Sequence, residues 1–107
     1  MIAVIFEADI VPTQQARYLE LAAELKPLLA SIEGFISIER FQSLTTEGKV
    51  LSLSWWRDED SVLLWKKNLF HKAAQAEGKA SIFSFYRIRV VSTLRDYTSV
   101  PGEPHHV

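Results

Sequence analysis

Hydrophobic and polar residues recur with different periods along the chain, and each change of period marks the expected border of an element. Residues 2–9 are apolar, rich in β-branched side chains and have a period of two, which predicts a strand. From residue 14 to 32, apolar residues recur at every third or fourth position, which predicts a helix with Thr13 as its N-cap. Pro27 lies inside this pattern, so we expect a kink or a break there.

Two further strands joined by a hairpin follow this helix. Gly34 is the expected end of the helix, and residues 35–42 and 49–56 have the composition of strands. The polar residues 43–48 between them predict a hairpin turn.

A second helical region and a long last strand complete the chain. Carboxylates at residues 58–60 predict a helix start, because the helix dipole favours negative charge in the first turn, and Gly78 closes this region. Residues 82–97 have the composition of a strand, but that length would extend over about 50 Å, so we expect a bulge, a bend or an excursion onto another subunit. The order βαββαβ predicts an α+β, ferredoxin-like fold with an antiparallel sheet and both helices on one face.

Both faces of the predicted sheet carry apolar side chains. The alternation of the second strand places Phe35 and Phe41 on one face, and in the third strand the adjacent Trp55 and Trp56 point to opposite faces. The two helices can cover only one face, and an apolar patch of that size does not stay exposed on a monomer. We therefore predict a homodimer in which a second copy packs on the free face.

The amino-acid composition mainly excludes certain classes of protein and kinds of site. The 12 basic and 13 acidic residues lack the basic excess of a general nucleic-acid binder, and the absence of cysteine excludes disulfide scaffolds, cysteine nucleophiles and thiolate metal sites. The early apolar run at residues 2–6 is too short for a signal peptide or a membrane helix, so we expect a cytoplasmic protein without membrane attachment. The length of 107 residues predicts one domain at 1–97 and a tail at 98–107.

Three segments together carry a family resemblance: GFISIERFQS, GKVLSLSWWRDEDSVLLWKKNLFHKAAQ and FYRIRVVSTLRDY. They resemble the antibiotic biosynthesis monooxygenase (ABM) family of small dimeric α/β-barrel proteins. The resemblance implies a monooxygenase that oxidises a small aromatic or quinol-type substrate without a tightly held cofactor. The family also includes haem-degrading enzymes, so haem is the one cofactor that the resemblance leaves open.

The resemblance also implies site residues. At the positions used by the cofactor-free oxygenases, Trp65 matches a Trp, His71 stands in place of a Tyr, Ser61 in place of an Asn, and Arg87 lies near an Arg position. The haem-degrading members use an Asn, a Trp and a His. This chain retains the Trp as Trp65 but has Glu7 in place of the Asn and Gln75 in place of the His, so two of the three groups are changed. We therefore take Trp65 and His71 as candidate catalytic residues, with Glu7 and Arg87 as candidate substrate-binding residues.

The spacing of Trp65 and His71 leaves two interpretations open. Six residues correspond to about 240° around an intact helix, so the two side chains share a face only if the helix breaks between them, near Asn68. Trp65 is then either a core residue or the aromatic wall of a cleft, and His71 is either a surface residue or a base facing that cleft. A neutral imidazole in the cleft would accept a phenolic proton and raise the electron density of the substrate for attack on O₂.

Glu7 needs a partner if its strand face is buried, and Arg87 or Arg40 are the expected ones. A structural ion pair and a perturbed carboxylate in a pocket are the two interpretations. For the whole protein, three hypotheses remain: a cofactor-free oxygenase, a non-catalytic dimer that binds a hydrophobic small molecule, and a haem-binding protein that uses His71.

Overall fold

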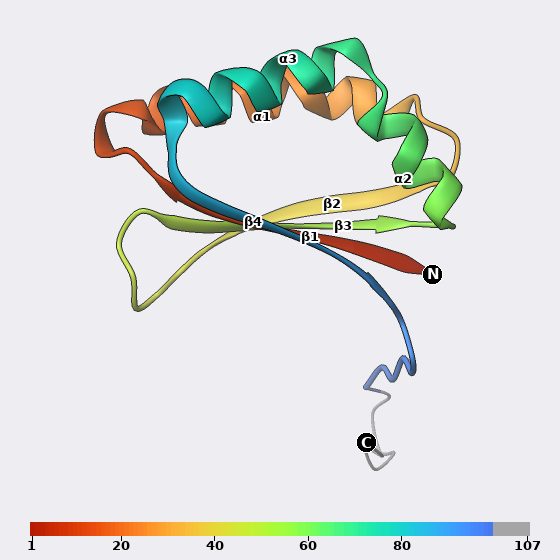
Figure 1. The fold of residues 1–107 in the computed structure, drawn as a ribbon. Coiled ribbons are helices and arrows are strands. Elements are labelled where there is room, and N and C mark those ends of the chain that lie inside the picture. Colours follow the sequence, from red (N-terminus) through yellow and green to blue (C-terminus); the bar gives the residue numbers. More distant parts are fainter. Residues whose placement is uncertain (100–107) are drawn as a thin grey trace.

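The computed structural model describes residues 1–99 as one sheet with helices packed on one of its faces (Figure 1). The tail expected at 98–107 lies, from residue 100 onwards, outside the described residues. In chain order the elements are β1 (Ile2–Ile10), the 3₁₀ turn η1 (Pro12–Gln14), α1 (Gln15–Ala30), β2 (Phe35–Gln42), β3 (Lys49–Trp56), α2 (Glu59–Lys66), α3 (Leu69–Glu77), the π-helical turn η2 (Gly78–Ile82) and β4 (Phe83–Ser92).

The four strands are antiparallel and lie in the order β2-β3-β1-β4. Figure 1 shows that α1, α2 and α3 all cover the same face, so the predicted α+β, ferredoxin-like arrangement is confirmed. The hairpin turn at 43–48 and the helix start after residue 57 are confirmed as well. Asp58 caps α2, accepting a hydrogen bond from the backbone N–H of Ser61 at 2.9 Å.

Two expectations for the first helix, an N-cap at Thr13 and a break at Pro27, are wrong. Thr13 lies in η1 and is not the N-cap. The N-cap of α1 is Gln14, whose side chain makes no capping hydrogen bond, and the helix begins at Gln15. Pro27 does not break the helix, which is continuous from Gln15 to Ala30. Apolar side chains before and after the proline, Leu25 and Leu29, pack in the same core cluster, and this shared burial favours a continuous helix.

The last strand is shorter than predicted, and a bulge interrupts its pairing. Asp9 of β1 faces Phe85 while Ile10 faces Phe83, so Ser84 is an extra residue on β4. The strand ends at Ser92, and no helix or strand is assigned to the described residues after it. The bulge is one of the three interruptions that the excessive length of this segment predicts.

A second bulge corrects the predicted faces of β2. Its register with β3 shifts between Phe35 and Ser37, so that Ile36 is an extra residue. Phe35 therefore packs under the helices against Trp56, with ring centroids 5.2 Å apart, whereas Phe41 faces away from them. The prediction that Phe35 and Phe41 share a face is wrong, because strict alternation holds only for an uninterrupted strand.

The core between helices and sheet has two clusters of buried residues. One consists of Ile10, Tyr18 and Ile82, and the other of Leu29, Trp56 and Trp65. Trp56 is almost fully buried, and its indole N–H donates to the Ser54 hydroxyl at 2.9 Å. Trp55, in contrast, lies on the other face of the sheet, as predicted for adjacent strand residues.

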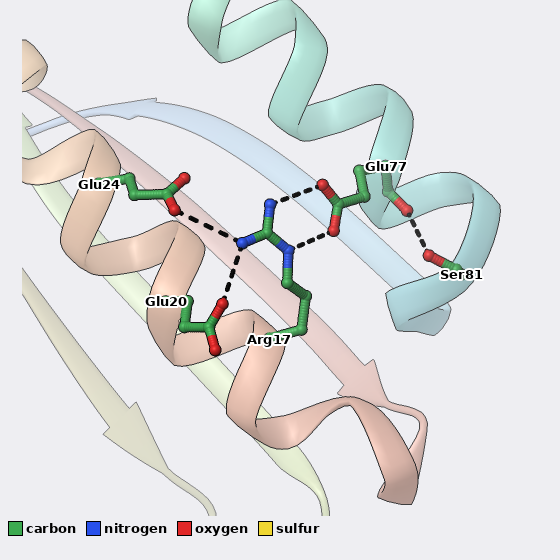
Figure 2. Close-up of polar contacts among 5 residues, drawn as sticks. All are labelled: Arg17, Glu20, Glu24, Glu77 and Ser81. Atoms are coloured by element: carbon green, nitrogen blue, oxygen red, sulfur yellow. Dashed lines mark hydrogen bonds and ion pairs between the residues drawn. The ribbon is translucent and has the colours of Figure 1, made fainter.

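The side chain of Arg17 joins the first and third helices (Figure 2). Its guanidinium makes two hydrogen bonds to the carboxylate of Glu77 on α3, one of them 2.8 Å long, and it also contacts Glu20 and Glu24 of its own helix. The bond with Arg17 lowers the pKa of Glu77. Within residues 1–99, no helix is long and apolar enough to span a membrane.

Candidate functional site

A cavity of about 380 Å³ lies between the helices and the sheet. All three α-helices and all four strands contribute to its lining, and most of the lining side chains are apolar. The apolar walls include Val4, Phe6, Leu21, Leu25, Ile38, Trp65, Phe83 and Ile88. A cavity of this volume and polarity accommodates a small, largely apolar molecule.

Trp65 and His71 meet in this cavity because the helix breaks between them. The helix α2 ends at Lys66, and Asn68 begins α3 by accepting hydrogen bonds from the backbone N–H groups of Phe70 and His71, at 2.9 and 3.1 Å. The new helix direction brings the imidazole against the indole, with ring centroids 4.6 Å apart. The predicted break near Asn68 is confirmed, and His71 is not a surface residue.

Replacing Asn68 with alanine should lower the free energy of unfolding by about 1 kcal/mol, because the first turn of α3 loses its side-chain cap. Asn68→Asp is the matched control, since an aspartate retains an oxygen acceptor at the same place. Urea unfolding followed by circular dichroism checks both variants. Equal stability of the alanine and aspartate variants would contradict the capping role.

The electrostatic state of His71 follows from its burial. Desolvation lowers the pKa of the imidazole from 6.5 to about 4, because the charged form loses water without gaining an acidic partner. His71 is therefore neutral at neutral pH, with a nitrogen lone pair able to accept a proton. His71 is thus a neutral acceptor beside an aromatic wall, and the same desolvation makes it a weaker base than a solvated histidine.

This lowered pKa makes stability depend on pH in a defined window. In the unfolded chain His71 takes up a proton as the pH falls through 6.5, whereas in the folded protein it does so only near 4. The neutral His71 therefore makes its full contribution to the free energy of unfolding above pH 6.5, and this contribution is lost progressively as the pH falls from 6.5 to 4. The unfolding free energy of the wild type, measured relative to that of His71→Gln, should therefore decrease as the pH is lowered from 6.5 to 4. A pH-independent difference would show that His71 is solvated.

The structure places Glu7 and Arg87 on the opposite face of the sheet from Trp65 and His71. They are cross-strand neighbours in β1 and β4, and neither lines the helix–sheet cavity. The ion pair expected for Glu7 forms with other partners, since its carboxylate contacts Lys49 at 2.8 Å and Arg89 at 3.7 Å. The hydrogen bond from Lys49 is the main cause that lowers the pKa of Glu7.

The two other family positions have different environments. Ser61 is buried at the start of α2, where its hydroxyl donates to Asp58 at 2.7 Å, so it serves the helix cap. Gln75 lies on α3 and lines the cavity together with Trp65 and His71.

The cavity is also lined by polar residues that the sequence pattern does not assign to the site: Tyr18, Arg40, Ser52, Ser54, Lys66 and Lys79. Tyr18 belongs to the apolar stripe predicted for the first helix, and the sequence suggests Arg40 only as a partner for Glu7, but both line the cavity. The signal for Arg40 was its position two residues after Ile38, which places both side chains on the face toward the helices.

Gly78 shapes the wall of the cavity next to Phe83. A Cβ atom at this position would lie 2.5 Å from the ring of Phe83, so only glycine lets the ring pack against the turn η2. Phe83 in turn contacts Tyr18 and Phe6, with ring centroids 6.1 and 5.3 Å apart.

Comparison with known proteins agrees with this fold and confirms the family resemblance. Residues 1–77 match the model of the family described as antibiotic biosynthesis monooxygenase. The chain belongs to this family.

One relative and two solved structures show how far the similarity extends. The chain is 44% identical over 90 residues to a protein of Pyricularia oryzae named jasmonate monooxygenase ABM; the match covers 84% of this chain but only 42% of that protein, so the chain spans less than half of this relative. The structure of Rv0793 from Mycobacterium tuberculosis superposes with a TM-score of 0.80 at 13% identity, covering 91% of this chain and 98% of the other. SnoaB, a cofactor-independent oxygenase from Streptomyces nogalater, has a TM-score of 0.79 at 9% identity, with 92% and 97% covered. At these identities the two structures show a common fold.

Proposed function

We propose that the protein is a homodimeric monooxygenase that oxidises a small aromatic or quinol-type substrate in the helix–sheet cavity without a tightly held cofactor. The observation that carries the proposal is the partly buried imidazole of His71 against the indole of Trp65 in an apolar cavity. The relative named jasmonate monooxygenase supports the reaction class.

In this mechanism the indole of Trp65 packs against the substrate, and His71 accepts a proton from its acidic hydroxyl or activated methylene group. The resulting anion is electron-rich and donates electrons to O₂. One oxygen atom enters the product and the other leaves as water. When a methylene group becomes a carbonyl group, or when a hydroquinone gains one oxygen atom and leaves as the hydroxyquinone, the substrate itself supplies all four electrons, so the reaction balances without an external reductant. The surrounding apolar side chains keep water away from the reactive anion.

The homodimer is part of the proposal because the sheet face opposite the helices has no cover within residues 1–99. Its side chains include Phe41 and Phe85, each 45% exposed, together with Val91 and the partly buried Trp55 and Leu53. A face-to-face second copy would bury them. Sedimentation at micromolar concentration should detect a species of twice the chain mass, and a monomer would refute this part.

The substrate-binding roles of Glu7 and Arg87 stay predictions. Both residues lie on this uncovered face, so a role in binding would require a place other than the helix–sheet cavity.

Oxygen consumption with a panel of hydroquinones, anthrone and jasmonate tests the activity. Uptake above the buffer control with at least one substrate is the expected result. If no substrate reacts but some bind, the protein is instead a non-catalytic binder. Titration with hemin tests the haem alternative, which requires a shifted Soret band that disappears in His71→Ala.

A further inference from the structure

The charged residues that line the helix–sheet cavity all have the same sign. Arg40, Lys66 and Lys79 contribute to the lining, and no aspartate or glutamate does so among the described residues. The chain as a whole is nearly neutral, with a formal charge of −1, so this local excess of positive charge is a property of the cavity. Cationic groups around a low-dielectric space favour an anionic ligand.

Arg40 is the cation best placed for direct contact with a ligand. It projects from β2 on the helix side of the sheet, next to Ser52 of β3 in the strand register. Arg40 is half-buried and takes part in no ion pair within residues 1–99. Arg87 and Arg95 have no carboxylate partner there either, but neither of them lines the cavity. An arginine without an acidic partner can make two parallel hydrogen bonds to a carboxylate.

Tyr18, close to Arg40, supplies a second observation. Its side chain is 8% exposed, and its hydroxyl is buried without a hydrogen-bond partner among the described residues. Burial raises the pKa of Tyr18, and Arg40, through its positive charge and its closeness to the hydroxyl as a hydrogen-bond donor, partly offsets this effect. A buried, unpaired hydroxyl costs folding free energy, and a ligand oxygen in the cavity would satisfy it.

We propose that the cavity selects apolar molecules that carry a carboxylate, which Arg40 binds through its guanidinium and Tyr18 through its hydroxyl. The inference rests on the proposed function only in taking this cavity as the substrate site, and it names the substrate class. The apolar walls hold the body of the acid, and the single guanidinium and hydroxyl provide donors for one carboxylate group.

Calorimetric titration with 1-naphthaleneacetate and its neutral analogue 1-naphthaleneacetamide tests the proposal. Both probes are flat, apolar and nearly equal in size. The acid should bind wild type at least about 10-fold more tightly than the amide, in line with the strength of charge-assisted hydrogen bonds. Arg40→Gln should abolish this preference without weakening the amide, and Tyr18→Phe should reduce it about 3- to 10-fold.

Two further variants keep the result interpretable. Lys26→Gln removes one positive charge from an exposed position of α1 outside the cavity and should bind the acid as wild type does. Arg40→Lys retains the charge but loses the planar guanidinium, so its preference for the acid over the amide should lie between those of wild type and Arg40→Gln. This variant also tests the role of Arg40 if Arg40→Gln fails to fold.

Four results would overturn the proposal. The first is that wild type binds the acid and the amide with equal affinity, and the second is that Arg40→Gln weakens the binding of both probes equally. The third is that Lys26→Gln loses as much affinity for the acid as Arg40→Gln does. The fourth is that neither probe binds at millimolar concentration. A preference for the acid without oxygen consumption by any substrate would retain this inference and refute the oxygenase, so the two failures are distinguishable.

Discussion

Replacing His71 with glutamine should lower the rate of substrate oxidation by about 10²-fold or more, the usual contribution of a positioned general base. Glutamine retains polarity and similar length, but its amide cannot accept a proton at neutral pH. Oxygen uptake at saturating substrate measures the loss. Binding of the substrate should change much less, because the cavity walls are retained.

The pH profile provides a second measurement of the same role. Because burial lowers the pKa of His71 to about 4, the free enzyme keeps its base in the neutral form through the whole range above pH 5. The ratio of turnover to KM should therefore be flat from pH 5 to 8 and fall below that range. Lys72→Gln, at the exposed neighbouring position of α3, is the control and should retain wild-type rates. Activity of His71→Gln within twofold of wild type would reduce His71 to a packing residue.

Replacing Gly34 with alanine should cost at least about 3 kcal/mol of unfolding free energy, a large part of the 5–15 kcal/mol typical of a domain. Gly34 connects α1 to β2 with a φ of 90°, a conformation that costs other residues about 1–2 kcal/mol. A Cβ atom there would also lie 1.8 Å from the hydroxyl oxygen of Ser61. Since Ser61 would have to move, its hydrogen bonds to Asp58 at the cap of α2 would be lost too.

Gly48→Ala separates the backbone cost from the steric clash. Gly48 also has a positive φ, of 78°, but a Cβ atom there meets only the carbonyl oxygen of Ile10 at 3.4 Å. Urea unfolding should therefore show a clearly smaller loss for Gly48→Ala. The double variant Gly34→Ala/Ser61→Gly, which removes the obstructing side chain, should recover part of the loss relative to Gly34→Ala. Equal losses at the two glycines would contradict the steric argument.

The candidate site could be predicted in part from the sequence. The sequence indicates Trp65 and His71 as one candidate pair but leaves open whether they share a face, and the cap at Asn68 decides this. Arg40 was not assigned to the site because the opposing residues of the helices are distant in sequence. Its lack of an acidic partner is visible only when the chain is folded.

The sequence by itself determined the element order, the antiparallel fold class, the opposite faces of Trp55 and Trp56 and the apolar character of both sheet faces. These features follow from local periods of two and 3.6 residues, which need no knowledge of distant contacts. Only the tertiary structure decided the bulges at Ile36 and Ser84, the continuity of α1 through Pro27 and the partners of Glu7. The physical reason is that strand register and side-chain pairing depend on contacts between residues far apart in sequence, whose combined burial outweighs local preferences.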